Sequence, residues 1–305
     1  MKRKVLFIGV LLLVLVAVLV AGAKLRGRTE DAGKLQVTAS FYPLAEFTRQ
    51  IGGDKVAVTT LVAPGVEPHD YEPKPQDLTR LYHSALLVYN GAGFEHWVNS
   101  LKDGLRSHEV IMVDTSKDVS LIATQNDAES PTDPHVWLDP LRAEQQAHSI
   151  AAALITADPA HKKYYEAREN ALVAKFSELD VAYREGLATC RIRKLVTSHQ
   201  AFGYIADRYQ LTVQSLSGLS PDEEPSPQKL AEIAQFVKTE DIHYIFFESL
   251  VSPKLATTIA NETGAQTLVF DPIEGVTQEA AASGTDYFSI QKDNLQNLRR
   301  ALDCK

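Results

Sequence analysis

Cysteine is scarce in this 305-residue chain, which contains two, Cys190 and Cys304, and no Cys-x-x-Cys pair. A thiolate zinc cluster and a dithiol redox motif are therefore excluded. The His-Glu-x-x-His motif of zinc proteases and the Gly-x-Ser-x-Gly elbow of serine hydrolases are missing too. If the chain is exported, the two cysteines can form one disulfide, and two unpaired thiols are the alternative.

Long apolar runs are also missing, apart from one near the N-terminus. Val5–Ala23 is uncharged and mostly aliphatic, and basic residues lie on both sides of it. This pattern predicts an export signal, and Ala21-Gly22-Ala23 fits a small-residue cleavage site. The run nearly reaches the roughly 20 residues that span a bilayer, so a retained membrane anchor is the alternative. In both cases the rest of the chain is exported, to the periplasm or the outer face of the cytoplasmic membrane.

Positive charge is in short supply after residue 34. The first 34 residues hold seven of the 31 Lys and Arg and two of the 39 acidic residues, which leaves 24 basic and 37 acidic residues and a formal net charge of −13. So acidic a body is a poor partner for phosphate backbones, and we predict no nucleic-acid partner. It can attract cations, but net charge does not locate a site.

Short β-branched runs alternate with helical patterns along most of the chain, which indicates parallel α/β units. The expected strands are Gln36–Ser40, Val56–Val62, Ala85–Asn90, Val110–Asp114, Lys194–Ser198, Thr212–Leu216, His243–Glu248 and Thr267–Phe270. The expected helices are Pro43–Ile51, Pro75–Tyr82, Phe94–Leu105, Leu141–Ala157, His161–Ala188, Ala201–Tyr209, Pro227–Thr239, Pro253–Thr263 and Tyr287–Leu302.

Four strands precede the long helical stretch and four follow it, so we predict an α/β protein with two lobes. Each lobe would have a four-stranded, mainly parallel sheet flanked by helices. We expect a signal or anchor with its linker at residues 1–34, an N-terminal lobe at 35–160, one linking helix at 161–188 and a C-terminal lobe at 189–305. That helix would be about 40 Å long at 1.5 Å per residue. A rigid helix between two lobes predicts a cleft between them.

Potential metal donors follow predicted strands in both lobes. His69 and His135 come after the second and fourth strands, and His199 and Asp271 come after the first and last strands of the second half. In parallel sheets, ligands collect beyond the carboxyl ends of the strands. Three imidazoles and one carboxylate are a complete set for tetrahedral zinc. Each residue alone has an ordinary explanation: His69 and Asp271 as turn residues, His199 as a helix cap and His135 as a ring packed against Trp137. Their joint placement favours a metal site.

Several segments resemble the metal-specific solute-binding receptors of bacterial ABC importers, the cluster A-I or zinc and manganese receptors. The resemblance covers nearly all of residues 35–302. Its carriers are Ser40-Phe41-Tyr42-Pro43, Pro68-His69-Asp70-Tyr71-Glu72-Pro73, His135-Val136-Trp137-Leu138-Asp139-Pro140, Ser198-His199-Gln200-Ala201-Phe202-Gly203-Tyr204, Pro225-Ser226-Pro227 and Phe270-Asp271-Pro272.

This resemblance implies two lobes bridged by one long helix and a divalent metal ion bound in the cleft by His69, His135, His199 and Asp271. It also implies a receptor rather than an enzyme, with the membrane permease of an ABC transporter as partner, and we expect a monomer. Candidates to accept the second N–H of a ligating imidazole are Asp139, Glu248 and Glu67.

The donor set favours Zn²⁺ over Mn²⁺ as the transported ligand. Receptors resembling the manganese type have a carboxylate at the position of His199, and a third imidazole suits zinc better. Many zinc receptors, however, carry a His-rich insertion that residues 116–132 lack. This absence keeps a manganese-type receptor as an alternative. An exported zinc-dependent hydrolase and an adhesin are two further alternatives for the function. The hydrolase is the weakest of these chemically, because catalytic zinc usually keeps an open position for water.

Overall fold

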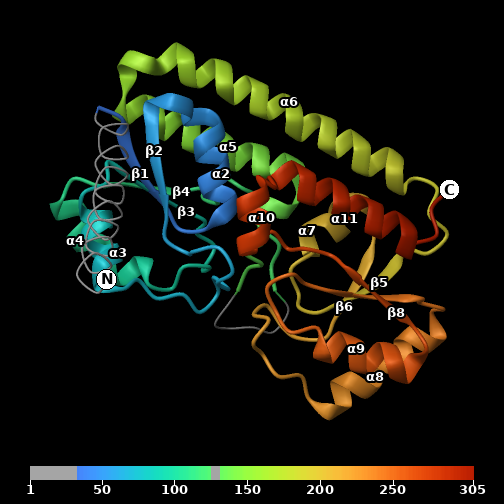
Figure 1. The fold of residues 1–305 in the computed structure, drawn as a ribbon. Helices are drawn as coiled ribbons and strands as arrows, with labels where there is room; N and C mark the ends of the chain where they lie inside the picture. The colour runs from blue at the N-terminus through green and yellow to red at the C-terminus, as the bar shows by residue number, and fades with distance from the viewer. Residues whose placement is uncertain (1–32, 125–130) are drawn as a thin grey trace, which may run out of the picture.

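The computed structural model describes residues 33–124 and 131–305 (Figure 1). The predicted signal or anchor, with its cleavage site, lies outside the described residues except for its last two positions. Among the helices that the structure describes, none is long and apolar enough to cross a membrane.

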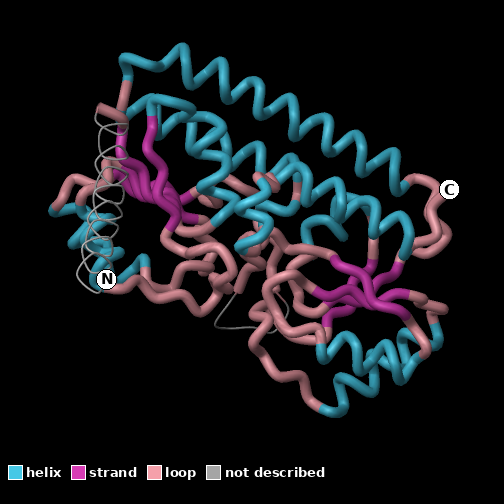
Figure 2. The backbone as a smooth tube through the Cα atoms, viewed as in Figure 1, coloured by secondary structure: helices cyan, strands magenta, loops and turns pink. Residues whose placement is uncertain are grey.

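Two separate four-stranded sheets form the two lobes (Figure 2). All neighbouring strands run parallel, in the orders β2-β1-β3-β4 and β6-β5-β7-β8. The predicted two-lobe α/β class is confirmed. The strands are β1 (Leu35–Ala39), β2 (Val56–Thr60), β3 (Leu86–Tyr89), β4 (Ile111–Asp114), β5 (Lys194–Thr197), β6 (Thr212–Ser215), β7 (Tyr244–Phe247) and β8 (Gln266–Val269).

Helices flank both sheets and join the lobes. They are α2 (Tyr42–Gly52), α3 (Pro75–Tyr82), α4 (Val98–Ser107), α5 (Pro140–Ala157), α6 (Lys162–Leu187), α7 (Gly203–Tyr209), α8 (Pro227–Thr239), α9 (Lys254–Thr263), α10 (Gln278–Ser283) and α11 (Tyr287–Ala301).

Two of these helices differ from the prediction. Helix α4 begins four residues late because the Glu95 carboxylate accepts the backbone N–H groups of Asn90 and Gly91, which keeps this segment in turns. Helix α10 was not predicted. It has six residues, too few to show a helical period, and begins where the Thr277 side chain accepts the Ala280 N–H.

Helix α6 runs along both lobes (Figure 1). Its 26 residues are about 39 Å long at 1.5 Å per residue. The fully buried Phe176 ring lies 5.2 Å from Phe47 of α2 and 5.2 Å from Phe288 of α11. One hydrophobic core therefore extends along the helix from lobe to lobe. The boundaries at residues 35–160, 161–188 and 189–305 stay predictions.

Buried hydrogen bonds tie the lobes together beside the cleft. The indole N–H of Trp137, in the N-terminal lobe, donates to the Pro272 carbonyl in the C-terminal lobe at 2.7 Å. The Tyr287 hydroxyl donates to the Trp137 carbonyl at 2.6 Å. All three groups are screened from water, so these bonds strongly constrain how the two halves meet.

A disulfide joins Cys190 to Cys304 across 114 residues of sequence. The alternative of two unpaired thiols is therefore wrong. The bond connects the segment after α6 to the residues after α11, so it holds the C-terminal end of the chain against the start of the second lobe.

Candidate metal centre

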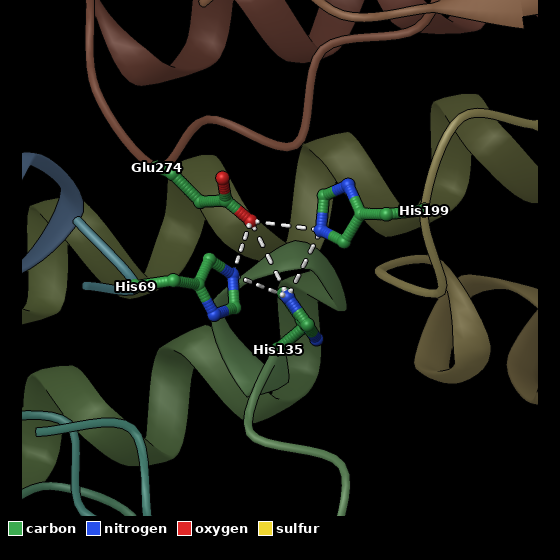
Figure 3. Close-up of side chains that lie close together, drawn as sticks. All are labelled: His69, His135, His199 and Glu274. Atoms are coloured by element: carbon green, nitrogen blue, oxygen red, sulfur yellow. Dashed lines mark hydrogen bonds and ion pairs between the residues drawn. The ribbon is translucent and has the colours of Figure 1, made fainter. Parts of the chain in front are cut away.

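Four side chains from four different loops point toward one another (Figure 3). His69 lies in the loop after β2, and His135 lies just before a short 3-10 turn at Val136–Leu138. His199 follows β5 closely, and Glu274 follows β8 after a short loop. The carboxyl ends of the strands in both lobes thus contribute, as expected for ligand sites in parallel sheets.

The four donor atoms have the spacing of a zinc coordination shell. Oε1 of Glu274 lies 3.3, 3.3 and 3.2 Å from Nε2 of His69, His135 and His199. Nε2 of His135 lies 3.4 Å from that of His69 and 3.3 Å from that of His199, and all four atoms lie within 4.8 Å of one another. Bonds of about 2.0–2.1 Å in a tetrahedron separate the ligands by about 3.3 Å, which the five separations of 3.2–3.4 Å match.

The structure places Glu274, not Asp271, beside the three imidazoles, so the carboxylate of this cluster differs from the one that the sequence analysis expected. The Asp271 carboxylate accepts the backbone N–H of Ile273 at 2.7 Å and is not part of the cluster. Sequence reasoning took the first carboxylate after the strand. Ile273 has a φ of +56°, a rare turn for a β-branched residue, and the side chain of the next residue, Glu274, reaches the three imidazoles.

Two buried carboxylates orient two of the imidazoles. His135 donates from Nδ1 to Asp133 at 2.8 Å, and His199 donates from Nδ1 to Glu248 at 2.6 Å. Because a carboxylate accepts but does not donate, both rings are held with the Nε2 lone pair toward the centre when they are neutral. Four lone-pair donors then face one another, and this arrangement favours a cation between them.

Of the three carboxylates that the sequence analysis proposed for this orienting role, one bonds an imidazole ring. Glu248 fills it, whereas Asp139 accepts from Leu141 N–H as the cap of α5 and pairs with Arg142. Glu67 accepts the backbone N–H of His69, at 3.1 Å from each carboxylate oxygen, and does not bond the ring. Asp133 was missed, although it lies two residues before His135, where its side chain can reach both the ring and the backbone N–H.

The side chains of the cluster are almost completely shielded from solvent. The side chains of His135 and His199 are 0% exposed and that of Glu274 is 3% exposed, while His69 keeps 10%. Burial disfavours the charged forms, but the charges of Glu248 and Glu274 outweigh it and raise the pKa of His199 well above its usual value. Burial also opposes ionisation of Glu274, yet the imidazoles hold its pKa well below the usual range.

His69 is the ligand candidate nearest to solvent. A cavity of about 90 Å³ lies against it, and its lining includes Asp70 and His96 together with Glu223, which follows β6. Burial lowers the pKa of His69, so this ring is the most readily neutral of the three histidines near pH 7.

Residues 37–301 match the family described as zinc-uptake complex component A, periplasmic, or ZnuA. The chain belongs to this family. Across 289 aligned residues it is 36% identical to the high-affinity zinc uptake system protein ZnuA of Bacillus subtilis, covering 91% of each chain. It is also 36% identical to the zinc-binding lipoprotein AdcA of Streptococcus pneumoniae, of which it spans 56%.

Solved structures agree with the fold of this ZnuA-family chain. The Zn(II)-bound ZnuA-like domain of S. pneumoniae AdcA is 38% identical, with a TM-score of 0.79 over 89% of this chain and all of that one. The laminin-binding protein Lmb of Streptococcus agalactiae, described as a bifunctional protein with adhesin and metal-transporting activity, is 32% identical, with a TM-score of 0.80 over 88% of this chain and 99% of that one.

Membership of the ZnuA family makes the chain an extracytoplasmic binding receptor of a zinc-uptake system, not an enzyme. The zinc-type resemblance is confirmed, and the zinc-uptake relatives do not favour the manganese, hydrolase or adhesin alternatives.

Proposed function

We propose that the protein captures Zn²⁺ outside the cytoplasm through His69, His135, His199 and Glu274 and delivers it to the membrane permease of an ABC transporter. The observation that supports this most strongly is the spacing of the four donor atoms, five of whose six separations are 3.2–3.4 Å. We further propose that it acts as a monomer in the periplasm or at the outer face of the cytoplasmic membrane.

The donor types favour zinc over manganese. Three imidazole nitrogens and one carboxylate oxygen suit a borderline, four-coordinate ion, whereas Mn²⁺ prefers oxygen-rich shells with more ligands. The two imidazoles fixed by Asp133 and Glu248 resist the rearrangement that a fifth and sixth ligand would require. Four protein donors also leave no position for a reactive water, which suits an ion that is carried rather than used in catalysis.

Native mass spectrometry after competition among Zn²⁺, Mn²⁺ and Fe²⁺ tests this proposal. Purified protein offered the three ions at equal concentration should carry one Zn²⁺ per chain, because the nitrogen-rich tetrahedral set favours zinc by affinity and geometry together. A preference for Mn²⁺ or Fe²⁺, or a stoichiometry other than one, would contradict the proposed cargo and site.

Zinc affinity is predicted to rise with pH. Glu248 and Glu274 raise the pKa of His199 against the opposing effect of burial, and Asp133 and Glu274 do the same for His135. These rings therefore hold a proton more strongly than a free imidazole does, and zinc must displace it to bind. Each displaced proton weakens binding by about tenfold per pH unit below the imidazole pKa.

Competition titrations across about pH 6 to 8, with proton release measured by calorimetry in buffers of different ionisation enthalpy, would follow this dependence. Affinity that does not change across the range, with no proton released, would show that the imidazoles are already neutral and would contradict the prediction.

A further inference from the structure

The loop Asp271–Glu274 is held by a bond at each of its first three residues. Asn294 of α11 accepts the Asp271 backbone N–H at 2.8 Å and donates to the Asp271 carbonyl at 2.7 Å. The Pro272 carbonyl accepts the Trp137 indole N–H at 2.7 Å, and the Ile273 N–H donates to Asp271 Oδ1 at 2.7 Å. The loop that carries Glu274 is therefore built for one conformation.

Ile273 adopts the least favourable backbone in this loop. Its φ of +56° lies in the left-handed region, where a β-branched side chain crowds its own backbone. The side chain is also fully buried in the core. A carboxylate that accepts the N–H two residues along forms an Asx turn, which supports such a conformation locally. Asp271 supplies that support.

We propose that Asp271 is a positioning residue for the zinc site: its carboxylate holds Ile273 in the left-handed conformation, and so presents Oε1 of Glu274 to the three imidazoles. This inference rests on the proposed function, because it concerns how the fourth donor is placed. Asp271 acts through hydrogen-bond acceptance by Oδ1, not by touching the ion. Two side chains after β8 thus act on the site: Glu274 supplies a donor to the ion, and Asp271 supplies the acceptor that holds the loop.

The proposal predicts different results for two substitutions at the same position. Asp271→Ala removes the acceptor for the Ile273 N–H and should weaken zinc binding by about 10- to 100-fold, the usual cost of losing a residue that orients a ligand. Asp271→Asn keeps an Oδ1 acceptor and should bind zinc within about threefold of wild type. If the negative charge of Asp271 were what mattered, the two variants would bind equally poorly.

A double-mutant cycle with Glu274 tests whether Asp271 acts through that residue. Glu274→Ala should weaken binding by about 10²- to 10³-fold, since it removes one of the four donors that together hold the ion. In that background Asp271→Ala should change affinity by less than about twofold, because no donor remains to be positioned. An undiminished effect of Asp271→Ala in the Glu274→Ala background would overturn the proposal.

Co²⁺ gives a readout that a merely structural role would not move. Its visible absorption reports coordination geometry, so the spectrum of Co²⁺-loaded Asp271→Ala should shift toward that of Glu274→Ala, and the spectrum of Asp271→Asn should resemble wild type. Asp180→Ala is the matched control. Asp180 is also a buried aspartate, bonded to Tyr209 and Arg184, so its loss should destabilise the fold without changing the spectrum.

The two hypotheses fail in distinguishable ways. If the wild-type protein and Glu274→Ala bind zinc equally weakly, the proposed function is refuted. If wild type binds zinc tightly, Glu274→Ala binds it poorly and Asp271→Ala binds it like wild type, the proposed function stands and the positioning role is refuted.

Discussion

Replacing His199 with alanine is expected to weaken zinc binding by about 10²- to 10³-fold, because it removes one of four donors that share about 10–16 kcal/mol. It also leaves Glu248 buried without the ring N–H that it accepts, which should cost about 1–3 kcal/mol of unfolding free energy. The rest of the fold should persist, since one core extends along α6. Titration against a chromophoric chelator and circular dichroism would measure the two effects.

His148→Ala is the control for this experiment. His148 lies on α5 with 52% of its side chain exposed and pairs with Glu169 at 2.6 Å, away from the donor cluster. Its loss should leave zinc affinity unchanged. Equal affinities of His199→Ala and wild-type protein would remove His199 from the site.

Removing the disulfide should produce the largest loss of stability. Replacing both Cys190 and Cys304 with alanine opens a link across 114 residues. Chain entropy alone assigns about 4.7 kcal/mol to a link closing a loop of about 100 residues. At about 2 °C per kcal/mol for a chain of this size, the melting temperature should fall by about 10 °C.

Differential scanning calorimetry of oxidised wild type and of the double variant would check this loss. The zinc affinity of the folded variant should stay near that of wild type, because neither cysteine contacts a donor or its orienting carboxylate. A melting temperature within about 2 °C of wild type would show that the bond adds little beyond the noncovalent contacts around it.

The sequence was sufficient to predict the strands and the long helices, because their residue patterns repeat over a short stretch of the chain. Alternating β-branched runs located all eight strands of the described residues to within a few residues, and the long helical stretch between the fourth and fifth strands located α5 and α6. Histidines at strand ends were found because parallel sheets bring those ends to one edge. Only the three-dimensional arrangement shows that His135, besides packing on Trp137, lies in a cluster with two other imidazoles and a carboxylate.

The placement of Glu274 beside the three imidazoles could not be predicted, because it depends in part on long-range contacts. Asp271 and Glu274 are both carboxylates after β8, and the choice between them is made by the left-handed turn at Ile273. The Ile273 N–H is bonded by Asp271, and the residues before it are bonded by two side chains distant in sequence: Asn294 bonds Asp271, and Trp137 bonds Pro272. Asp133 was overlooked for a different reason: an aspartate before proline is typical of an ordinary turn, and its bond to His135 becomes evident only once the ring orientation is known.

Anomalous diffraction at the zinc edge from crystals of zinc-loaded protein tests the central claim most directly. We predict one ion per chain, with Nε2 of His69, His135 and His199 and an oxygen of Glu274 at about 2.0–2.2 Å. An ion bonded to Asp271 instead of Glu274, or held away from any of the three imidazoles, would contradict this prediction.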